Sequence, residues 1–153
     1  MPDLLAGTTV LAQDTPPVQF VTDGTDIVGF TDIVFTAGTP IVGVVFTAPT
    51  TGRVRVDWHS RFQPTSAVAA QVAFALRSGS TLGAGAMVQD GLNEHCLETP
   101  NVSGSGSRVQ ASMYSIVSGL TPGSVYNAVV CHRMVSAGSG TIFARSIGVS
   151  PCS

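Results

Sequence analysis

The sequence predicts an all-β protein, a single antiparallel and jelly-roll-like β-sandwich of about eight to ten short strands. Valine is the commonest residue, and β-branched residues favour strands. Glutamate and leucine, which favour helices, are scarce. Short apolar runs alternate with turn signals, and no run of ten or more residues has a convincing helical period. The turns follow one another as they do in sandwiches and jelly rolls.

Residues 1–17 are expected to form an extended arm ahead of the sandwich. Pro16 and Pro17 stiffen the exit from this segment and exclude a helix there. The arm has apolar side chains that need an apolar surface to contact, and these are Leu4, Leu5, Val10 and Leu11. The chain is therefore divided into an arm over residues 1–17 and a β-sandwich domain over residues 18–153.

Strands are expected at short intervals beyond the arm. Residues 18–21 and 27–30 flank Thr-Asp-Gly-Thr, which is typical of a hairpin turn. A polar, Gly/Ser-rich stretch over 90–107 is expected to be a long surface loop. The other strands are expected at 33–36, 41–46, 53–62, 71–77, near Met87, and at 108–117, 125–135 and 141–149.

The clearest strand is the segment 53–62, where apolar and polar residues alternate. Such alternation is typical of a strand with one face in a core. The expected inward residues are Val54, Val56, Trp58 and Phe62, and the expected outward residues are Arg53, Arg55, Asp57, His59 and Arg61.

The segment 71–77 has no polar face, because Val72, Phe74 and Leu76 alternate with alanines. It is therefore expected to be buried on both sides, by a second sheet or by a neighbouring subunit.

Charged residues make up only 10% of the chain, against roughly 25% in a typical soluble domain. There is no lysine, and the net charge is −2. The surface is then either neutral and rich in hydroxyl groups or covered largely by other chains, and the second interpretation is favoured. A nucleic-acid partner is not expected without a basic patch, and a membrane is not expected without a long apolar run. No signal peptide is recognisable at the start.

The outward face of the segment 53–62 is the best candidate for a contact surface. Its members are Arg53, Arg55, His59 and Arg61. Arginine is tolerated at interface cores, since its stem packs and its planar head donates several hydrogen bonds. The alternative is an ordinary solvated face.

The three cysteines, Cys96, Cys131 and Cys152, are an odd number, which favours reduced thiols over a disulfide framework. One bridge with one remaining thiol is the alternative. Reduced thiols fit assembly in a cytoplasm.

No constellation of catalytic residues is recognisable, so an enzyme, a cofactor and a metal site are not expected. No serine has the flanking glycines of a nucleophile elbow, and no glycine cluster completes a phosphate loop. Cys131 and His132 are adjacent, and neighbours on a strand point to opposite faces. Cys131 is expected to pack as a small apolar residue, and His132 to be exposed or hydrogen-bonded.

Two segments resemble parts of known β-sandwiches. Phe46-Thr-Ala-Pro-Thr-Thr-Gly-Arg-Val-Arg-Val resembles the approach to an early strand in trimeric jelly-roll heads of the C1q/TNF kind. Ser118-Gly-Leu-Thr-Pro-Gly-Ser-Val-Tyr126 resembles the corner of β-sandwich domains such as fibronectin type III. That resemblance implies that Leu120 fills the core, Pro122-Gly123 makes the turn, and the Tyr126 hydroxyl ties the corner back.

Most of the chain is similar to small structural proteins of tailed phages that infect actinobacteria. The similar parts are Leu-Leu-Ala-Gly-Thr-Thr-Val-Leu-Ala, Pro-Pro-Val-Gln-Phe-Val-Thr-Asp-Gly-Thr, Phe-Thr-Ala-Pro-Thr-Thr-Gly-Arg-Val and Gly-Leu-Thr-Pro-Gly. The resemblance implies a virion part, assembled in the host cytoplasm, such as a capsid decoration protein or a minor tail or fibre protein. Its expected partners are further copies of itself, in a trimer, and major capsid or tail proteins.

The alternative function is a carbohydrate- or receptor-binding head whose partner is a host surface glycan. Aromatic side chains stack on sugar rings, so Trp58, Tyr114 and the loop 90–107 are the expected contacts in that case. The assignment of Trp58 to the core side of its strand counts against this alternative.

Overall fold

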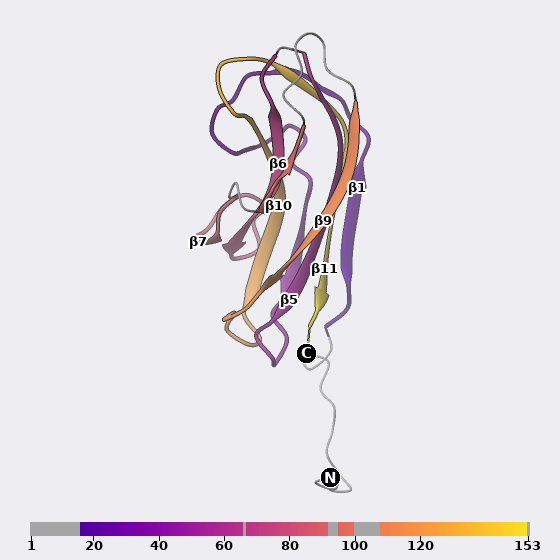
Figure 1. Ribbon diagram of the computed structural model, residues 1–153. Coiled ribbons are helices and arrows are strands. Elements are labelled where there is room, and N and C mark those ends of the chain that lie inside the picture. Colours follow the sequence, from indigo (N-terminus) through magenta and orange to yellow (C-terminus); the bar gives the residue numbers. More distant parts are fainter. Residues whose placement is uncertain (1–15, 66, 92–94, 100–107, 153) are drawn as a thin grey trace, which may run out of the picture.

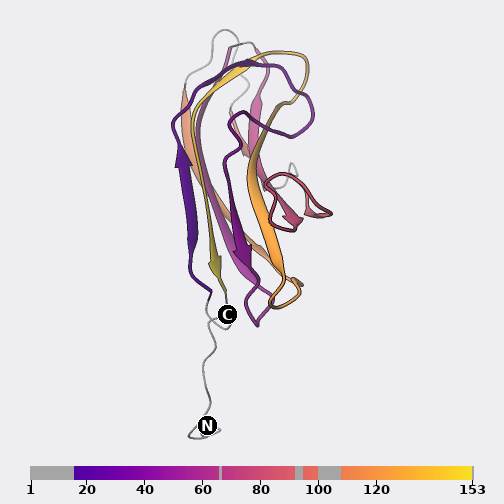
Figure 2. The same ribbon diagram turned by 180° about the vertical axis from the view of Figure 1, so that it is seen from behind.

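The computed structural model describes residues 16–65, 67–91, 95–99 and 108–152. These residues form two antiparallel β-sheets packed face to face, with no α-helix among them (Figures 1 and 2). The all-β sandwich expected from the sequence is confirmed.

Sheet A has five strands, and β11 lies at its centre. Its main order is β1-β11-β5-β9, and β2 also pairs with β11. The strands are β1 (Gln19–Asp23), β2 (Ile27–Phe30), β5 (Val54–Pro64), β9 (Val109–Val117) and β11 (Gly140–Pro151).

Sheet B has six strands, and its main order is β3-β10-β6-β7. In addition, β4 pairs with β10, and β8 pairs with β6. The strands are β3 (Thr36–Ala37), β4 (Gly43–Thr47), β6 (Ala70–Ser78), β7 (Met87–Gln89), β8 (Leu97–Glu98) and β10 (Val125–Met134).

The path of the chain between the sheets is that of a jelly roll. From β4 to β5, from β5 to β6, from β9 to β10 and from β10 to β11, the chain crosses each time to the other sheet. The first strand, β1, thereby pairs with the last, β11. Two sheets wound in this way bury their facing sides against each other.

The hairpin expected between residues 18–21 and 27–30 is wrong. Both β1 and β2 pair antiparallel with β11, at residues 145–149 and 140–142 respectively, so they run in the same direction and lie end to end. The turn residues between them kink one edge of the sheet instead of reversing the chain. Asp23 makes that kink, because its Oδ1 accepts a hydrogen bond of 2.8 Å from the backbone N–H of Thr25.

Two further expectations need correction at the level of single elements. A strand was expected at 33–36, but the strand found there, β3, comprises only Thr36–Ala37, and Ile33 and Val34 are exposed. The stretch 90–107 contains a short strand, β8, that pairs with Gln71 and Val72 of β6. The rest of that stretch is described only in part.

The core lies between the sheets and follows the alternation read from the sequence. Val54, Val56, Trp58 and Phe62 of β5 are all at most 1% exposed. The Trp58 ring packs against Phe74 of β6, with 4.8 Å between the ring centroids. Phe74 points inward from the opposite sheet, so this contact joins the two layers at the centre of the sandwich.

The strand β6 is buried on both faces, as expected, and the chain's own segments cover its outer face. Ala75 belongs to a small apolar cluster with Val129 and Cys131 on the outer side of sheet B. Phe35 and Leu82, from segments outside the long strands, pack over this cluster. No neighbouring subunit is needed to explain the apolar pattern of β6.

The two segments that resemble known sandwiches meet at one end of the fold. The Leu120 N–H donates to the Gly52 carbonyl at 3.0 Å, and the Gly123 N–H donates to the Ala48 carbonyl at 3.0 Å. The Tyr126 hydroxyl accepts a hydrogen bond of 3.0 Å from the Thr121 N–H, and Leu120 is buried. The expected roles of Leu120 and Tyr126 in the corner are therefore confirmed.

The Tyr126 hydroxyl is expected to contribute to stability in a measurable way. Tyr126→Phe leaves the Thr121 N–H without this acceptor, and such a loss costs about 1–2 kcal/mol of unfolding free energy. Urea unfolding of the two proteins measures the difference. Tyr114→Phe is the matched control, because Tyr114 is exposed and its hydroxyl lies outside this corner. Equal losses in both variants would contradict the role of the corner.

Candidate functional site

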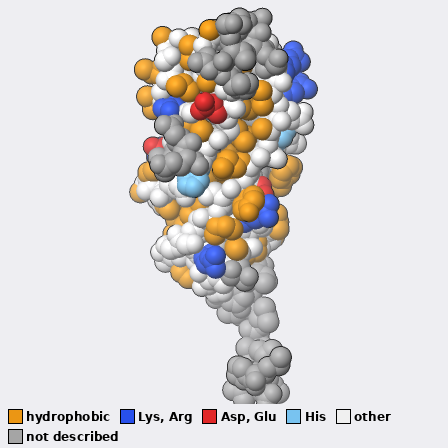
Figure 3. All heavy atoms as spheres, viewed as in Figure 1, with side chains coloured by type: hydrophobic (Ala, Val, Ile, Leu, Met, Phe, Trp, Pro, Cys, Tyr) orange, Lys and Arg blue, Asp and Glu red, His pale blue; other side chains and the backbone are white. Residues whose placement is uncertain are grey.

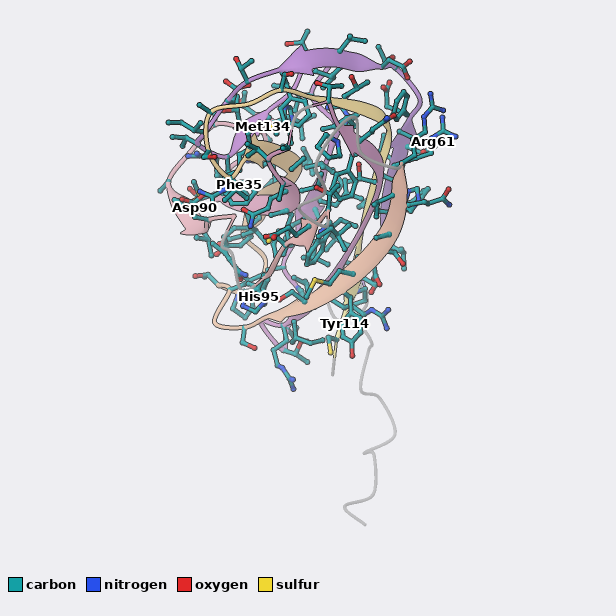
Figure 4. All side chains as sticks on the ribbon, turned by 45° about the horizontal axis from the view of Figure 1, so that its top comes forward. Phe35, Arg61, Asp90, His95, Tyr114 and Met134 are labelled. Atoms are coloured by element: carbon teal, nitrogen blue, oxygen red, sulfur yellow. The ribbon has the colours of Figure 1, made fainter. Side chains whose placement is uncertain are left out.

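The outer face of sheet A brings exposed aromatic rings close to polar side chains. Alternation along β5 turns its polar residues to this side. The neighbouring strands add Phe20 of β1 and Tyr114 of β9, whose exposed fractions are 67% and 57%. Figure 4 shows Tyr114 pointing away from the body of the sandwich. The outward residues of β5 are Arg55, Asp57, His59 and Arg61.

The register of the strands aligns the two rings across the sheet. Phe20 pairs with Gly148, Gly148 with Asp57, and Asp57 with Tyr114, so the four residues form one row. Because neighbouring strands lie about 4.8 Å apart, the row spans roughly 14 Å.

The face is hollowed between the two rings. Gly148 has no side chain, and Ser146 and Ser112 flank His59 in the adjacent row. The groove has a volume of about 230 Å³, and both Phe20 and Tyr114 line it. A Cβ atom on Gly148 would lie 3.1 Å from Cδ2 of Phe20, so the ring leans over the glycine. We call this hollow the sheet A groove.

Arg55, Asp57 and Tyr114 hold one another in fixed positions at one side of the groove. The Arg55 Nε donates to the two carboxylate oxygens of Asp57 at 2.9 and 3.0 Å, and its Nη2 donates to Oδ1 at 2.6 Å. The guanidinium carbon lies 4.3 Å from the centroid of the Tyr114 ring. The hydrogen bonds to Asp57 raise the pKa of Arg55. A carboxylate, a cation and an aromatic ring are thus preorganised on one surface.

Arg61 belongs to a second group on the same face of the protein. Its guanidinium carbon lies 5.3 Å from the centroid of the Phe143 ring, and that of Arg108 lies 3.8 Å from the same centroid. Figure 4 shows Arg61 pointing outward. The arginines expected to form one contact surface therefore divide, with Arg55 beside the groove and Arg61 beside Phe143.

The other residues expected at contact sites are distributed differently. Arg53 is exposed just before β5, while Leu4, Leu5, Val10 and Leu11 lie outside the described residues. Trp58 is 1% exposed and belongs to the core, so its indole ring cannot stack on a ligand. The sequence analysis missed Phe20. It directly precedes Val21 on β1, and because Val21 points inward, the alternation along the strand predicts that Phe20 points outward.

A buried polar cluster lies between the sheets, away from the groove. The expectation that His132 is exposed or hydrogen-bonded is wrong, because it is 1% exposed and its Nδ1 has no hydrogen-bond partner among the described residues. Its ring packs edge-on against Phe30, with 4.5 Å between centroids. Arg145 is fully buried nearby, and its Nη2 lies 3.7 Å from Oδ1 of Asp23.

Burial and charge set the protonation of this cluster. Burial, reinforced by the positive charge of Arg145 and opposed by Asp32, lowers the pKa of His132 to about 4. Burial also lowers the pKa of Arg145, against the attraction of Asp23. His132 is therefore neutral at pH 7.

Cys131 and His132 point to opposite sides of sheet B, as expected for neighbours on a strand. Cys131 packs in the outer apolar cluster, where burial raises the pKa of its thiol to about 12. Such a thiol is unreactive at neutral pH. Cys96, Cys131 and Cys152 are all present as thiols.

The described ranges contain no group of three or more His, Cys, Asp or Glu side chains placed to hold a metal ion. In those same ranges, no helix has the length and apolar character needed to cross a membrane.

No protein-family model matches the chain, and no curated protein is significantly similar to it. Among solved structures, the chain is similar to the CBM22-1 xylan-binding domain of Xyn10C from Paenibacillus barcinonensis. The identity is 11% over 88% of this chain and 87% of that domain, with a TM-score of 0.37. It is also similar to VP2 in a subviral particle of infectious bursal disease virus, at 12% identity over 90% of this chain and 42% of that chain, with a TM-score of 0.23.

Proposed function

We propose that the chain is a structural component of a phage virion, either a capsid decoration protein or a minor tail or fibre protein. In this proposal it forms a homo-oligomer, a trimer, and docks on a major capsid or tail protein through residues 1–17. The resemblance of most of the sequence to small actinobacterial phage proteins supports the virion role. The absence of any recognisable catalytic motif in the sequence agrees with a mechanical role.

The observation on which the oligomer rests is the apolar and weakly charged exterior. Figure 3 shows hydrophobic and neutral side chains over much of one face, with charged side chains in isolated places. Thirteen large apolar side chains are at least 37% exposed among the described residues. All except Phe20 and Tyr114 lie outside the sheet A groove. When another chain covers such exposed apolar area, its burial stabilises the association by about 25 cal/mol per Å².

The proposed arm supplies attachment, and the oligomer multiplies it. Leu4, Leu5, Val10 and Leu11 are the apolar residues that would contact the capsid or tail partner. When several arms are held in one oligomer, the second and third contacts form at a high effective concentration. Weak single contacts then give stable attachment.

Light scattering on the purified chain tests the oligomer. We expect a mass of three chains of 15.7 kDa each, maintained on dilution into the micromolar range. A chain that is monomeric at high concentration would refute the proposed oligomer.

Deleting residues 1–17 tests the arm. The truncated chain is expected to stay folded and oligomeric but to be lost from purified particles, as measured by mass spectrometry of the virions. The matched control replaces Leu4, Leu5 and Leu11 by Met and Val10 by Ile, which keeps the apolar surface and should preserve incorporation. Incorporation of the truncated chain at the normal level would overturn the docking role.

A further inference from the structure

We propose that the sheet A groove binds one ring of a neutral saccharide, with Phe20 stacking on the ring and the Arg55–Asp57 pair bonding its hydroxyl groups. The inference rests on the geometry of the groove and is independent of the virion role.

Phe20 is placed to contact a ligand and contributes little to the core. It is 67% exposed, whereas its neighbour Val21 turns inward and packs against the core. An exposed phenylalanine at the mouth of a groove offers a flat apolar face, and the C–H face of a pyranose ring is apolar too. The Phe20 ring itself lies over Gly148, so a ligand would contact this ring from the part of the groove that Asp57 and His59 line.

The Arg55–Asp57 pair supplies the polar half of the recognition. Asp57 accepts hydrogen bonds from Arg55, and the side chains of both residues are nearly half exposed. A carboxylate offers about four acceptor sites and a guanidinium offers five donors, so each retains capacity after the pair has formed. A hydroxyl group both donates and accepts, and two adjacent hydroxyls of a sugar match an acceptor next to a donor. The serine hydroxyls of Ser112 and Ser146 add neutral partners to the groove.

The site is preorganised, which favours binding of a small ligand. Arg55 is held by Asp57 and stacked on Tyr114, so little side-chain freedom is lost when a ligand binds. Phe20, Asp57 and Tyr114 project from paired strands and not from loops. The groove has a volume of about 230 Å³, which suits a single sugar ring better than a folded partner surface. The opposite charges of Arg55 and Asp57 compensate each other, so a neutral ring is favoured over an acidic one.

The test is binding of neutral oligosaccharides to the full chain. A glycan array with xylo-, gluco-, manno-, galacto- and N-acetylglucosamine oligosaccharides selects the probe, and isothermal titration then measures its affinity. Phe20→Ala and Asp57→Asn are each expected to weaken that affinity at least tenfold. Val28→Ala is the matched control, because Val28 is an exposed apolar residue outside the groove, and its affinity should be unchanged. Circular dichroism confirms that each variant is folded.

Two results would overturn the proposal. One is that no oligosaccharide of the panel binds at millimolar concentration. The other is that the selected oligosaccharide binds Phe20→Ala as tightly as the unchanged chain. If Phe20→Ala instead breaks the oligomer while no sugar binds, a second copy of the chain occupies the groove and the saccharide inference fails. Light scattering on the unchanged chain still reports separately on the proposed oligomer, so the two proposals can fail independently.

Discussion

Replacing Gly52 by alanine is expected to lower the unfolding free energy by about 3 kcal/mol, which is a large part of the stability of a domain of this size. Gly52 has φ of +62°, a region that costs a residue with a side chain about 1 kcal/mol or more. In addition, a Cβ atom there would lie 2.5 Å from the Leu120 carbonyl oxygen. That oxygen belongs to the backbone of the corner and cannot rotate away. Urea unfolding monitored by tryptophan fluorescence gives the difference.

Two other glycines separate the contributions of strain and collision. Gly123 has φ of +76° but no heavy atom within 4 Å of an added Cβ, so Gly123→Ala should cost only about 1 kcal/mol. Gly24 has neither feature, so Gly24→Ala should be close to neutral. If Gly52→Ala costs no more than Gly123→Ala, the close approach of Gly52 to Leu120 does not matter for stability.

Acidification is expected to destabilise the protein through His132. The pKa of His132 is about 4 in the folded chain and about 6.5 when unfolded, so only the unfolded chain binds the proton between these values. Neutral His132 therefore gives its full contribution to the unfolding free energy above pH 6.5, and this contribution is lost as the pH falls towards 4. The full loss is roughly 3 kcal/mol, of which about 2 kcal/mol is reached at pH 5. Urea unfolding at constant ionic strength from pH 7.5 to 4 measures it.

The variant His132→Leu assigns this pH dependence to one residue. Leucine keeps an apolar side chain against Phe30 and cannot take up a proton. The unfolding free energy of this variant should therefore change less between pH 6.5 and 5 than that of the unchanged chain, whatever its value at pH 7. His95→Gln removes a different, half-buried histidine and should keep most of the slope. A slope that is unchanged in His132→Leu would mean that other groups cause the acid sensitivity.

The sandwich could be predicted from the sequence wherever a local pattern determines the structure. The strict alternation of β5 determines which residues enter the core, and the Leu120 to Tyr126 corner determines its own hydrogen bonds. The pairing of β1 and β2 could not be predicted in this way. A turn sequence such as Thr-Asp-Gly-Thr allows a reversal or a kink, and only the distant strand β11 decides between them.

The candidate site was predictable in part for the same reason. Arg55, Asp57 and His59 were expected on an outward face because they follow one another on a single strand. Phe20 and Tyr114 line opposite sides of one groove only because β1 and β9 lie at the two edges of sheet A, which depends on the strand order. The interior position of His132 was missed because its strand, β10, is covered on both sides and has no polar face for comparison.

The pairing of β1 with β11 has a consequence for how the chain reaches its native state. During synthesis, β1, β2 and β5 emerge long before β11, the strand with which all three pair. Their backbone groups on that side have no hydrogen-bond partner in the sheet until residues 140–151 have been made. Contacts between such distant segments slow folding, and exposed edges of apolar strands invite association with other nascent chains. The chain has few charged groups, so repulsion between incompletely folded chains is weak. The soluble yield should therefore depend on the rate of synthesis, and slow expression at low temperature should raise it.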